Sequence, residues 1–298
     1  TKLKCREWSS EAISAATNKN HRTDPKICRN LLYGCGFEGP WHEMQPEKDD
    51  GGAFKINKGD LAIGSVTMKI YAVSDGPPSL AVRMALKALN IPHEHISVDF
   101  GAGEHMTDEY AKMNPQKEIP VLDDNGFFLS ESNAILQYLC DKYAPESSLY
   151  PKDATLRAVV NQRLCFNLAF LYPNISAYVM APIFFDYERT PIGLKKLTMA
   201  LSAFETYMSR TGTNFVAGNN LTIADFPLVT SVMCLEGINF DMTAYPLISK
   251  WYAGFKQQFP DLWSISAAGM AEIAEFEKNP PDLTGMEHPI HPIRKVQK

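Results

Sequence analysis

The chain lacks a long apolar segment, a Cys-x-x-Cys pair and a large excess of charge of either sign. No run of eighteen or more apolar residues occurs in its 298 residues, so we expect no membrane-spanning helix and no membrane partner. The net charge of −5 gives no electrostatic reason to expect nucleic-acid binding by the chain as a whole. The six cysteines are scattered, which favours a reducing compartment over a secreted disulfide framework.

The composition is typical of a protein with a packed core. Hydrophobic residues make up 45% of the chain and charged residues 21%, which at this length predicts about two domains. The chain begins at Thr1 and not at methionine, from which we expect a fragment of a longer protein or a processed product.

Residues 1–66 differ from the rest of the chain because they are polar and only weakly periodic. Cys28, Cys35 and His42 follow one another at even spacing, and thiolate and imidazole are the usual zinc ligands. Their spacing matches no compact zinc motif, so two interpretations stay open: a zinc-finger remnant, or a mobile leader with unpaired cysteines. Glycine, proline and paired acids in residues 43–66 predict a linker.

The next segment alternates between strand and helix patterns. Alternating apolar residues predict strands at 68–73 and 95–100, and apolar residues at helical spacing predict a helix at 80–89. Asn125-Gly126 lies between two apolar runs, which is a strong hairpin signal because both turn residues need a positive φ. The order predicts an α/β, thioredoxin-like domain over residues 67–144.

Strand patterns end after a proline-containing linker at residues 144–152. The periodicity predicts an all-helical domain over residues 152–267, with helices at 157–171, 193–210, 222–235 and 246–259. Thr222 and Asp225 fit a helix capping motif, in which the Thr222 hydroxyl accepts a free amide and the acid lies at the positive end of the helix. The motif explains the acid without catalysis. Residues 268–298 form a proline-containing tail, where His288 and His291 are more typical of a solvated segment than of a metal site.

Residues 114–133 concentrate the features that indicate a binding site. Ile119-Pro120 precedes a strand, where the proline removes a ladder donor and is a candidate for a cis bond. Glu131-Ser132 opens an apolar-periodic run, and a helix start with a small hydroxyl residue offers free N–H groups to an anion.

The order of Ile119-Pro120, the hairpin and Glu131-Ser132 resembles the glutathione site of the cytosolic glutathione transferases, and most of all the insect delta and epsilon enzymes. The resemblance covers about residues 68–267. It implies the glutathione transferase fold, a homodimer, and detoxifying conjugation of glutathione to small hydrophobic electrophiles. It also implies glutathione as a substrate and no metal in the transferase domains.

The resemblance assigns separate parts of glutathione to separate residues. The backbone before the proline would bind the cysteinyl part, the acid and serine at the next helix start the γ-glutamyl end, and two cationic side chains the glycyl end. Asn133 replaces the usual arginine. The implied glutathione-binding residues are His105, Lys117, Ile119, Pro120, Glu131, Ser132 and Asn133.

Conjugation needs a thiolate, and a free thiol with a pKa near ~8.5 is mostly protonated at neutral pH. In the delta and epsilon enzymes a serine after the first strand stabilises the anion, but that position falls on Gly76 here. We expect Ser79 or Ser74, which flank it, as the catalytic hydroxyl. Backbone donors, or no useful activation, remain as alternatives.

A second substrate would lie against the helical domain. The aromatic side chains there fit either an apolar pocket floor or ordinary core packing. The candidates for the hydrophobic site are Tyr110, Phe170, Tyr172, Tyr178 and Phe184.

A different function stays open beside catalysis. Residues 74–84 resemble insect proteins in which FLYWCH zinc fingers precede a transferase-like domain. That likeness, together with Gly76, allows a non-catalytic glutathione-binding or dimerising module of a zinc-finger nuclear regulator. In that case nucleic acid would be bound only through upstream fingers. The expected compartment is cytoplasmic or nuclear.

Overall fold

The structure is a computed structural model that describes residues 68–185, 187–283, 286 and 288–292. All of them belong to one unit of the chain, Leu61–Lys298. The expected leader and linker, with Cys28, Cys35 and His42, lie outside the described residues. Within the described part, no group of three histidine, cysteine or acidic side chains is placed to hold a metal ion.

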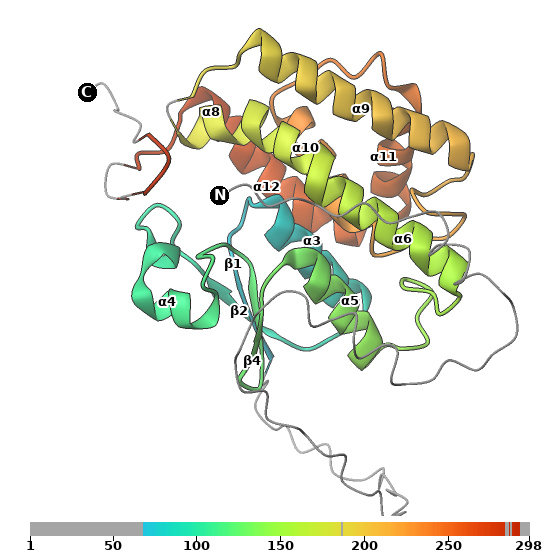
Figure 1. Ribbon diagram of the computed structural model, residues 1–298, viewed down its shortest axis with the longest axis horizontal. Coiled ribbons are helices and arrows are strands. Elements are labelled where there is room, and N and C mark those ends of the chain that lie inside the picture. Colours follow the sequence, from blue (N-terminus) through green and yellow to red (C-terminus); the bar gives the residue numbers. More distant parts are fainter. Residues whose placement is uncertain (1–67, 186, 284–285, 287, 293–298) are drawn as a thin grey trace, which may run out of the picture. The chain divides into compact units, whose positions relative to one another are not determined.

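The first module is a four-stranded sheet in the order β2-β1-β3-β4. β1 runs parallel to β2 and antiparallel to β3, which pairs antiparallel with β4. Helices α3 and α5 pack on each other, while α4 contributes Tyr110 to a separate cluster with Val98 and Val121 (Figure 1). The elements are β1 (Met68–Ala72), α3 (Pro77–Ala88), β2 (Glu94–Ser97), the short helix η1 (Glu104–Met106), α4 (Asp108–Met113), β3 (Val121–Asp124), β4 (Phe127–Leu129) and α5 (Ser132–Tyr143).

The predicted hairpin is confirmed in its turn geometry. Asn125 and Gly126 have φ values of 58° and 87°, and they join β3 to β4. The Gly126 amide donates to Asp123 Oδ1 at 2.7 Å, which closes the turn. Asparagine and glycine are the residues that adopt this left-handed backbone at least cost.

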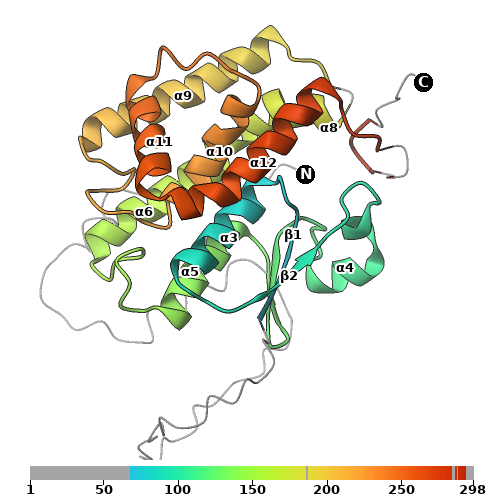
Figure 2. The same cartoon turned by 180° about the vertical axis from the view of Figure 1, so that it is seen from behind.

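The second module is entirely helical, so the predicted fold class is confirmed. In Figures 1 and 2 its helices gather on one side of the sheet module. It consists of α6 (Ala154–Phe166), η2 (Asn167–Leu171), α7 (Tyr172–Ile175), η3 (Ser176–Met180), α8 (Ala181–Phe184), α9 (Pro191–Thr211), α10 (Asp225–Gly237), α11 (Pro246–Gln258) and α12 (Pro260–Lys278).

The sequence patterns did not predict α12, which continues past residue 267 to Lys278. It follows α11 with Phe259 alone between them. Pro260 both ends one helix and starts the next, because proline lacks the N–H that a helix interior needs but fits the first turn. Gly269 of α12 lies against α3, where a β-carbon would come within 2.8 Å of Leu80 Cδ1.

Helices α6 to α8 form one continuous run, Ala154–Phe184. η2 and η3 are π-turns within it, and Pro173 follows the first of them. By length and composition alone the run could cross a membrane, a test that core helices also pass. Arg163 inside it is buried and donates to Val216 O at 2.9 Å, as expected of a helix in a protein core.

Helix α10 lies at the centre of the core and packs on both α3 and α12. Asp225 at its start is fully buried. Its Oδ2 accepts the Thr222 amide at 2.9 Å and the Thr222 hydroxyl at 3.1 Å. Its Oδ1 accepts the Val216 amide at 3.1 Å and Trp251 Nε1 at 3.0 Å. The expected cap is therefore supplied by the acid, and the Thr222 hydroxyl donates to Asp225 instead of accepting an amide.

Asp225→Ala is expected to destabilise the protein by about 3 to 5 kcal/mol, because it leaves several buried donors without an acceptor. Urea unfolding monitored by circular dichroism measures this. Asp241→Ala is the matched control, since Asp241 is exposed and accepts a single amide from Thr243. If Asp225→Ala lowers the free energy of unfolding no more than Asp241→Ala does, the proposed stabilising role of Asp225 is contradicted.

A second acidic centre ties the hairpin to α5. Oδ2 of buried Asp124 accepts Lys142 Nζ and the hydroxyls of Tyr138 and Tyr143, each at 2.6 Å. Asn125 donates to Oδ1 at 2.8 Å. Burial alone would raise the pKa of Asp124, but these hydrogen bonds hold it well below its usual range.

Asp124→Asn is expected to cost about 1 to 2 kcal/mol at pH 7, a figure that allows for the exposure of Lys142. Because the pKa of Asp124 is lower in the folded protein than its ordinary value of 3.8, the ionised carboxylate stabilises the fold above that pH. This stabilisation is lost as the pH falls toward the pKa of the folded protein. The difference in unfolding free energy between variant and wild type should therefore shrink below about pH 4. Asp141→Asn, at an exposed pair with Arg157, serves as the control. A difference that does not change with pH would show that the carboxylate charge plays no part.

Candidate glutathione site

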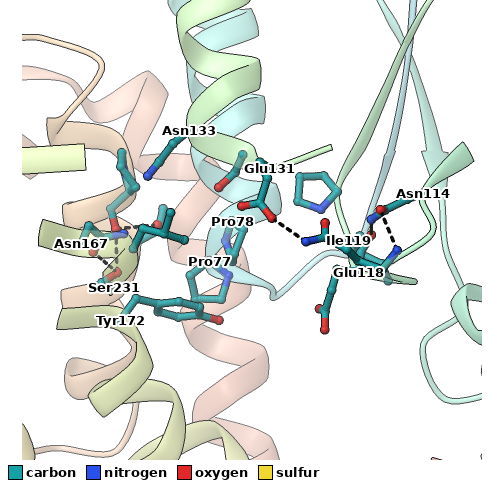
Figure 3. A pocket seen from close by; sticks show the side chains of 16 residues that line it. Pro77, Pro78, Asn114, Glu118, Ile119, Glu131, Asn133, Asn167, Tyr172 and Ser231 are labelled. Carbon is teal, nitrogen blue, oxygen red and sulfur yellow. Dashed lines mark hydrogen bonds between the residues drawn. The ribbon is translucent and has the colours of Figure 1, made fainter. Parts of the chain in front are cut away.

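A cavity of ≈150 Å³ lies where the two modules meet. Figure 3 shows the loop before β3 on one side, helical-domain residues on the other, and Pro77 and Pro78 between them. Its lining residues are Pro77, Pro78, Asn114, Gln116, Glu118, Ile119, Pro120, Glu131, Ser132, Asn133, Asn167, Leu168, Tyr172, Pro227, Thr230 and Ser231.

The loop before β3 is held by Asn114, which is 1% exposed. Asn114 Nδ2 donates to Glu118 O at 2.8 Å, and its Oδ1 accepts the Gln116 amide at 3.1 Å. The Tyr110 hydroxyl donates to the same Glu118 carbonyl at 3.2 Å. These bonds fix the main chain just before Ile119.

Ile119 and Pro120 are joined by a cis peptide bond, as the sequence suggested. Both residues line the cavity, and the ladder between β3 and β1 begins only at Val121. The Ile119 peptide therefore lies on the cavity wall without belonging to the sheet.

The start of α5 forms the facing corner of the cavity. Glu131 has a φ of 65°, a left-handed backbone that is uncommon outside glycine, and it immediately precedes Ser132 at the helix start. Gln116 Nε2 donates to Glu131 Oε1 at 3.2 Å, so the loop and the helix start are linked directly. The structure thus brings Ile119, Glu131 and Ser132 into one cavity, as the resemblance implied.

Asn133 completes this corner at the position where the resemblance leads one to expect arginine. Its Nδ2 donates to Leu164 O of α6 at 3.0 Å. Its Oδ1 is buried and has no hydrogen-bond partner among the described residues.

The cavity carries acidic charge. Glu118 and Glu131 both line it, and burial together with the Glu131 charge raises the pKa of Glu118. Two carboxyl groups facing one small space favour a ligand that carries an ammonium group.

The two cationic side chains expected at the glycyl end do not line the cavity. Lys117, with a φ of 58°, turns its Nζ to Met106 O at 2.6 Å and toward Asp108 at 3.7 Å. His105 is 4% exposed and stacks on Phe100 with ring centroids 4.7 Å apart. Burial, and the nearby His288, lower the pKa of His105 and favour its neutral form. Their expected contact with the glycyl carboxylate stays a prediction.

The expected catalytic serines also lie outside the cavity lining. Ser79 is fully buried, and its Oγ accepts the Val73 amide at 3.3 Å. Exposed Ser74 donates to Glu272 at 2.6 Å. A β-carbon on Gly76 would come within 2.6 Å of Val73 Cγ2, so a serine there would require Val73 to move. The role of Ser79 and Ser74 toward the thiolate stays a prediction.

The expected hydrophobic-substrate residues are not gathered in one place. Only Tyr172 lines the cavity. The Tyr110 hydroxyl donates to Glu118 O, and Phe170 is 40% exposed and lies beside Phe166. Tyr178 meets the Phe240 ring edge-on, and Phe184 lies between the rings of Phe100 and Phe276.

Sequence reasoning missed most of the helical wall. The lining residues it did not identify there are Asn167, Leu168, Pro227, Thr230 and Ser231. Ser231 donates to Asn167 Oδ1 at 2.9 Å, which joins α10 to η2 along this wall. No local pattern marks these residues, because the packing of α10 against α3 and against η2 brings them to the cavity.

Comparison with known proteins agrees with this geometry. Residues 66–141 match the family "Glutathione S-transferase, N-terminal domain", and residues 166–258 match "Glutathione S-transferase, C-terminal domain". Glutathione S-transferase D6 of Drosophila melanogaster is 33% identical over 209 residues, which are 70% of this chain and 96% of that protein.

Solved structures give the same result. A diazinon-metabolizing glutathione S-transferase of the silkworm Bombyx mori is 64% identical, with a TM-score of 0.66 over 69% of this chain and 98% of that one. A delta-class transferase of Nilaparvata lugens is 34% identical (TM-score 0.67, 72% of this chain and 100% of that one). An epsilon-class transferase of the housefly Musca domestica is 33% identical (TM-score 0.66, 72% and 98%). The chain belongs to the glutathione S-transferase family, among its insect delta and epsilon classes, and is a glutathione transferase.

Proposed function

We propose that the cavity between the loop before β3 and the start of α5 binds glutathione, and that the enzyme joins its sulfur to small hydrophobic electrophiles. The main support for this proposal is that Ile119, Glu131 and Ser132 line one cavity. In this arrangement the Ile119 peptide pairs with the cysteinyl main chain. The Glu131 carboxylate holds the γ-glutamyl ammonium, and the free N–H groups at the start of α5 hold its carboxylate.

The reaction requires an apolar second substrate beside the sulfur. Pro77, Pro78, Leu168 and Pro227 give the cavity a largely apolar wall toward α3 and the helical domain. Apolar walls favour electrophiles that leave water readily, which supports an aryl or alkyl substrate over a charged one.

Glu131→Gln is expected to weaken glutathione binding about tenfold or more, because it removes the charge that pairs with the ligand ammonium. Isothermal titration with glutathione measures the affinity. Glu146→Gln is the matched control, since Glu146 is exposed and pairs with Lys152 away from the cavity. Equal affinities of Glu131→Gln and wild type would contradict the proposed orientation of the ligand.

We also propose a homodimer that buries the outer face of the hairpin. Phe127, Phe128 and Tyr143 leave 49%, 41% and 41% of their surfaces exposed near this hairpin, where Tyr138 contacts the Phe127 ring. Phe127 and Phe128 follow each other in β4, the edge strand, so their side chains point to opposite faces of the sheet. Exposed aromatic side chains at a sheet edge are typical of a protein interface.

Phe128→Asp is expected to convert the dimer to a monomer, because it places a charge in an apolar contact. Sedimentation velocity of both proteins checks this. Ile192→Asp, at a 61% exposed position on α9, is the control and should leave the assembly unchanged. A wild type that is monomeric at all concentrations would contradict the proposal.

The organisation of the whole chain is likewise a proposal. A thioredoxin-like domain at 67–144 and a helical domain from 152 through α12 follow the two families matched. Residues 1–66 as the remnant of a FLYWCH finger, with a nuclear rather than cytoplasmic compartment, rest on sequence likeness alone. Zinc analysis of the purified full chain tests that part.

A further inference from the structure

The proposed function places the glutathione sulfur beside Ile119 and the start of α3, where a thiolate needs a hydrogen-bond donor. This corner offers few. Pro77 and Pro78, which line it, have no amide hydrogen, and Gly76 has no hydroxyl. The Ser79 hydroxyl is buried against the Val73 amide and does not line the cavity. A donor for the sulfur is therefore more readily found on the helical wall.

The helical wall carries three hydroxyl groups, and two of them already donate to carbonyls. Thr230 donates to Pro227 O at 3.2 Å. The Ser231 hydroxyl shares its one hydrogen between Pro227 O at 2.7 Å and Asn167 Oδ1 at 2.9 Å. The third belongs to Tyr172, the first residue after the π-turn η2. Figure 3 shows its ring beneath Pro77, with the hydroxyl directed toward the side where Glu118 and Ile119 lie.

The surroundings of Tyr172 keep it protonated. Burial raises the pKa of Tyr172 strongly, and Cys234, Asp75 and Glu118 add to the increase. An interaction with the Ser176 side chain, one turn further along, acts in the opposite sense. A phenol that stays protonated can donate a hydrogen bond to a ligand and does not act as a base.

We propose that the Tyr172 hydroxyl, contributed by the helical domain, donates the hydrogen bond that stabilises the glutathione thiolate in this enzyme. It takes over the function of the serine that Gly76 replaces. The inference rests on the proposed binding of glutathione in this cavity. It assigns Tyr172 to the sulfur instead of to the second substrate.

The chemical step balances in atoms and charge without a cofactor. The thiol loses its proton to water, and the Tyr172 O–H remains intact and donates to the sulfur anion. The sulfur lone pair then forms a bond to the electrophilic carbon. With an aryl chloride, the carbon–chlorine bond breaks and chloride leaves with its electron pair.

The carboxyl groups near this hydroxyl set the pH behaviour. Burial and Glu272 raise the pKa of Asp75 to about 6, so Asp75 is ionised near neutral pH. Burial and Glu131 raise the pKa of Glu118. Negative charge on Asp75 and Glu118 opposes a thiolate, so a thiolate in this corner needs a neutral donor such as the Tyr172 hydroxyl.

Tyr172→Phe removes the donor and keeps the ring. Titration of the bound thiol by its ultraviolet thiolate absorbance should show its pKa raised by about 1 to 2, with kcat for an activated aryl chloride lowered about ten- to a hundredfold near neutral pH. The loss in kcat should diminish as the pH rises. Glutathione affinity, measured by calorimetry near pH 6, should stay within about twofold of wild type, because the ligand is then bound as the thiol.

Tyr207→Phe is the matched control. Tyr207 lies in the helical domain against Arg163 and Phe166, and it does not line the cavity. Ser79→Ala tests the competing hydroxyl. A thiol pKa unchanged in Tyr172→Phe, or raised in Ser79→Ala alone, overturns the inference while leaving glutathione binding intact. A wild type that binds no glutathione overturns the proposed function and this inference together.

Fluorotyrosine at position 172 provides a second measurement if Tyr172→Phe folds poorly. It keeps the shape of the ring and makes the hydroxyl a stronger donor. The pKa of the bound thiol should then fall below that of the wild type. An unchanged or higher value overturns the inference.

Discussion

The hydrogen bonds of one buried asparagine hold the binding wall of this enzyme in place. The Asn114 side chain donates from Nδ2 to the Glu118 carbonyl and accepts the Gln116 main-chain amide at Oδ1. Its own carbonyl accepts the Lys117 amide at 2.9 Å. The short loop between α4 and β3 therefore has little freedom, and Ile119 and Glu131 keep their positions through a polar network that no sheet or helix provides.

Much of this arrangement follows from local sequence rules. Asn125-Gly126 dictates a hairpin because few other residue pairs tolerate two positive φ values. Ile119-Pro120 leads into a strand, and Ser132 begins a helix. These signals lie within twenty residues of one another, and their resemblance to the glutathione transferase site predicted a shared cavity. The fold class follows from local patterns, since each element carries its own periodicity.

The rest depends on contacts between residues far apart in the chain. Thr230 and Ser231 reach the cavity only because α10 packs on α3, and nothing in their neighbourhood marks them as binding residues. Helix α12 was missed because Pro260 stands where the preceding helix stops, with no loop to mark a new element. At Thr222 the motif was recognised but the bond direction was wrong, because Asp225 collects donors from Val216 and Trp251, which lie outside the motif.

The two π-turns in the run from α6 to α8 have a consequence for how related enzymes diverge. A π-turn holds one residue more than a regular helical turn, so each amounts to a single-residue insertion absorbed inside a helix. Loss or gain of one such residue would rotate the side chains that follow η2 while the ends of the run stay anchored. A very similar backbone can thus present a different residue to the cavity at the position of Tyr172, and the lining of the cavity can change through short deletions as well as through substitutions.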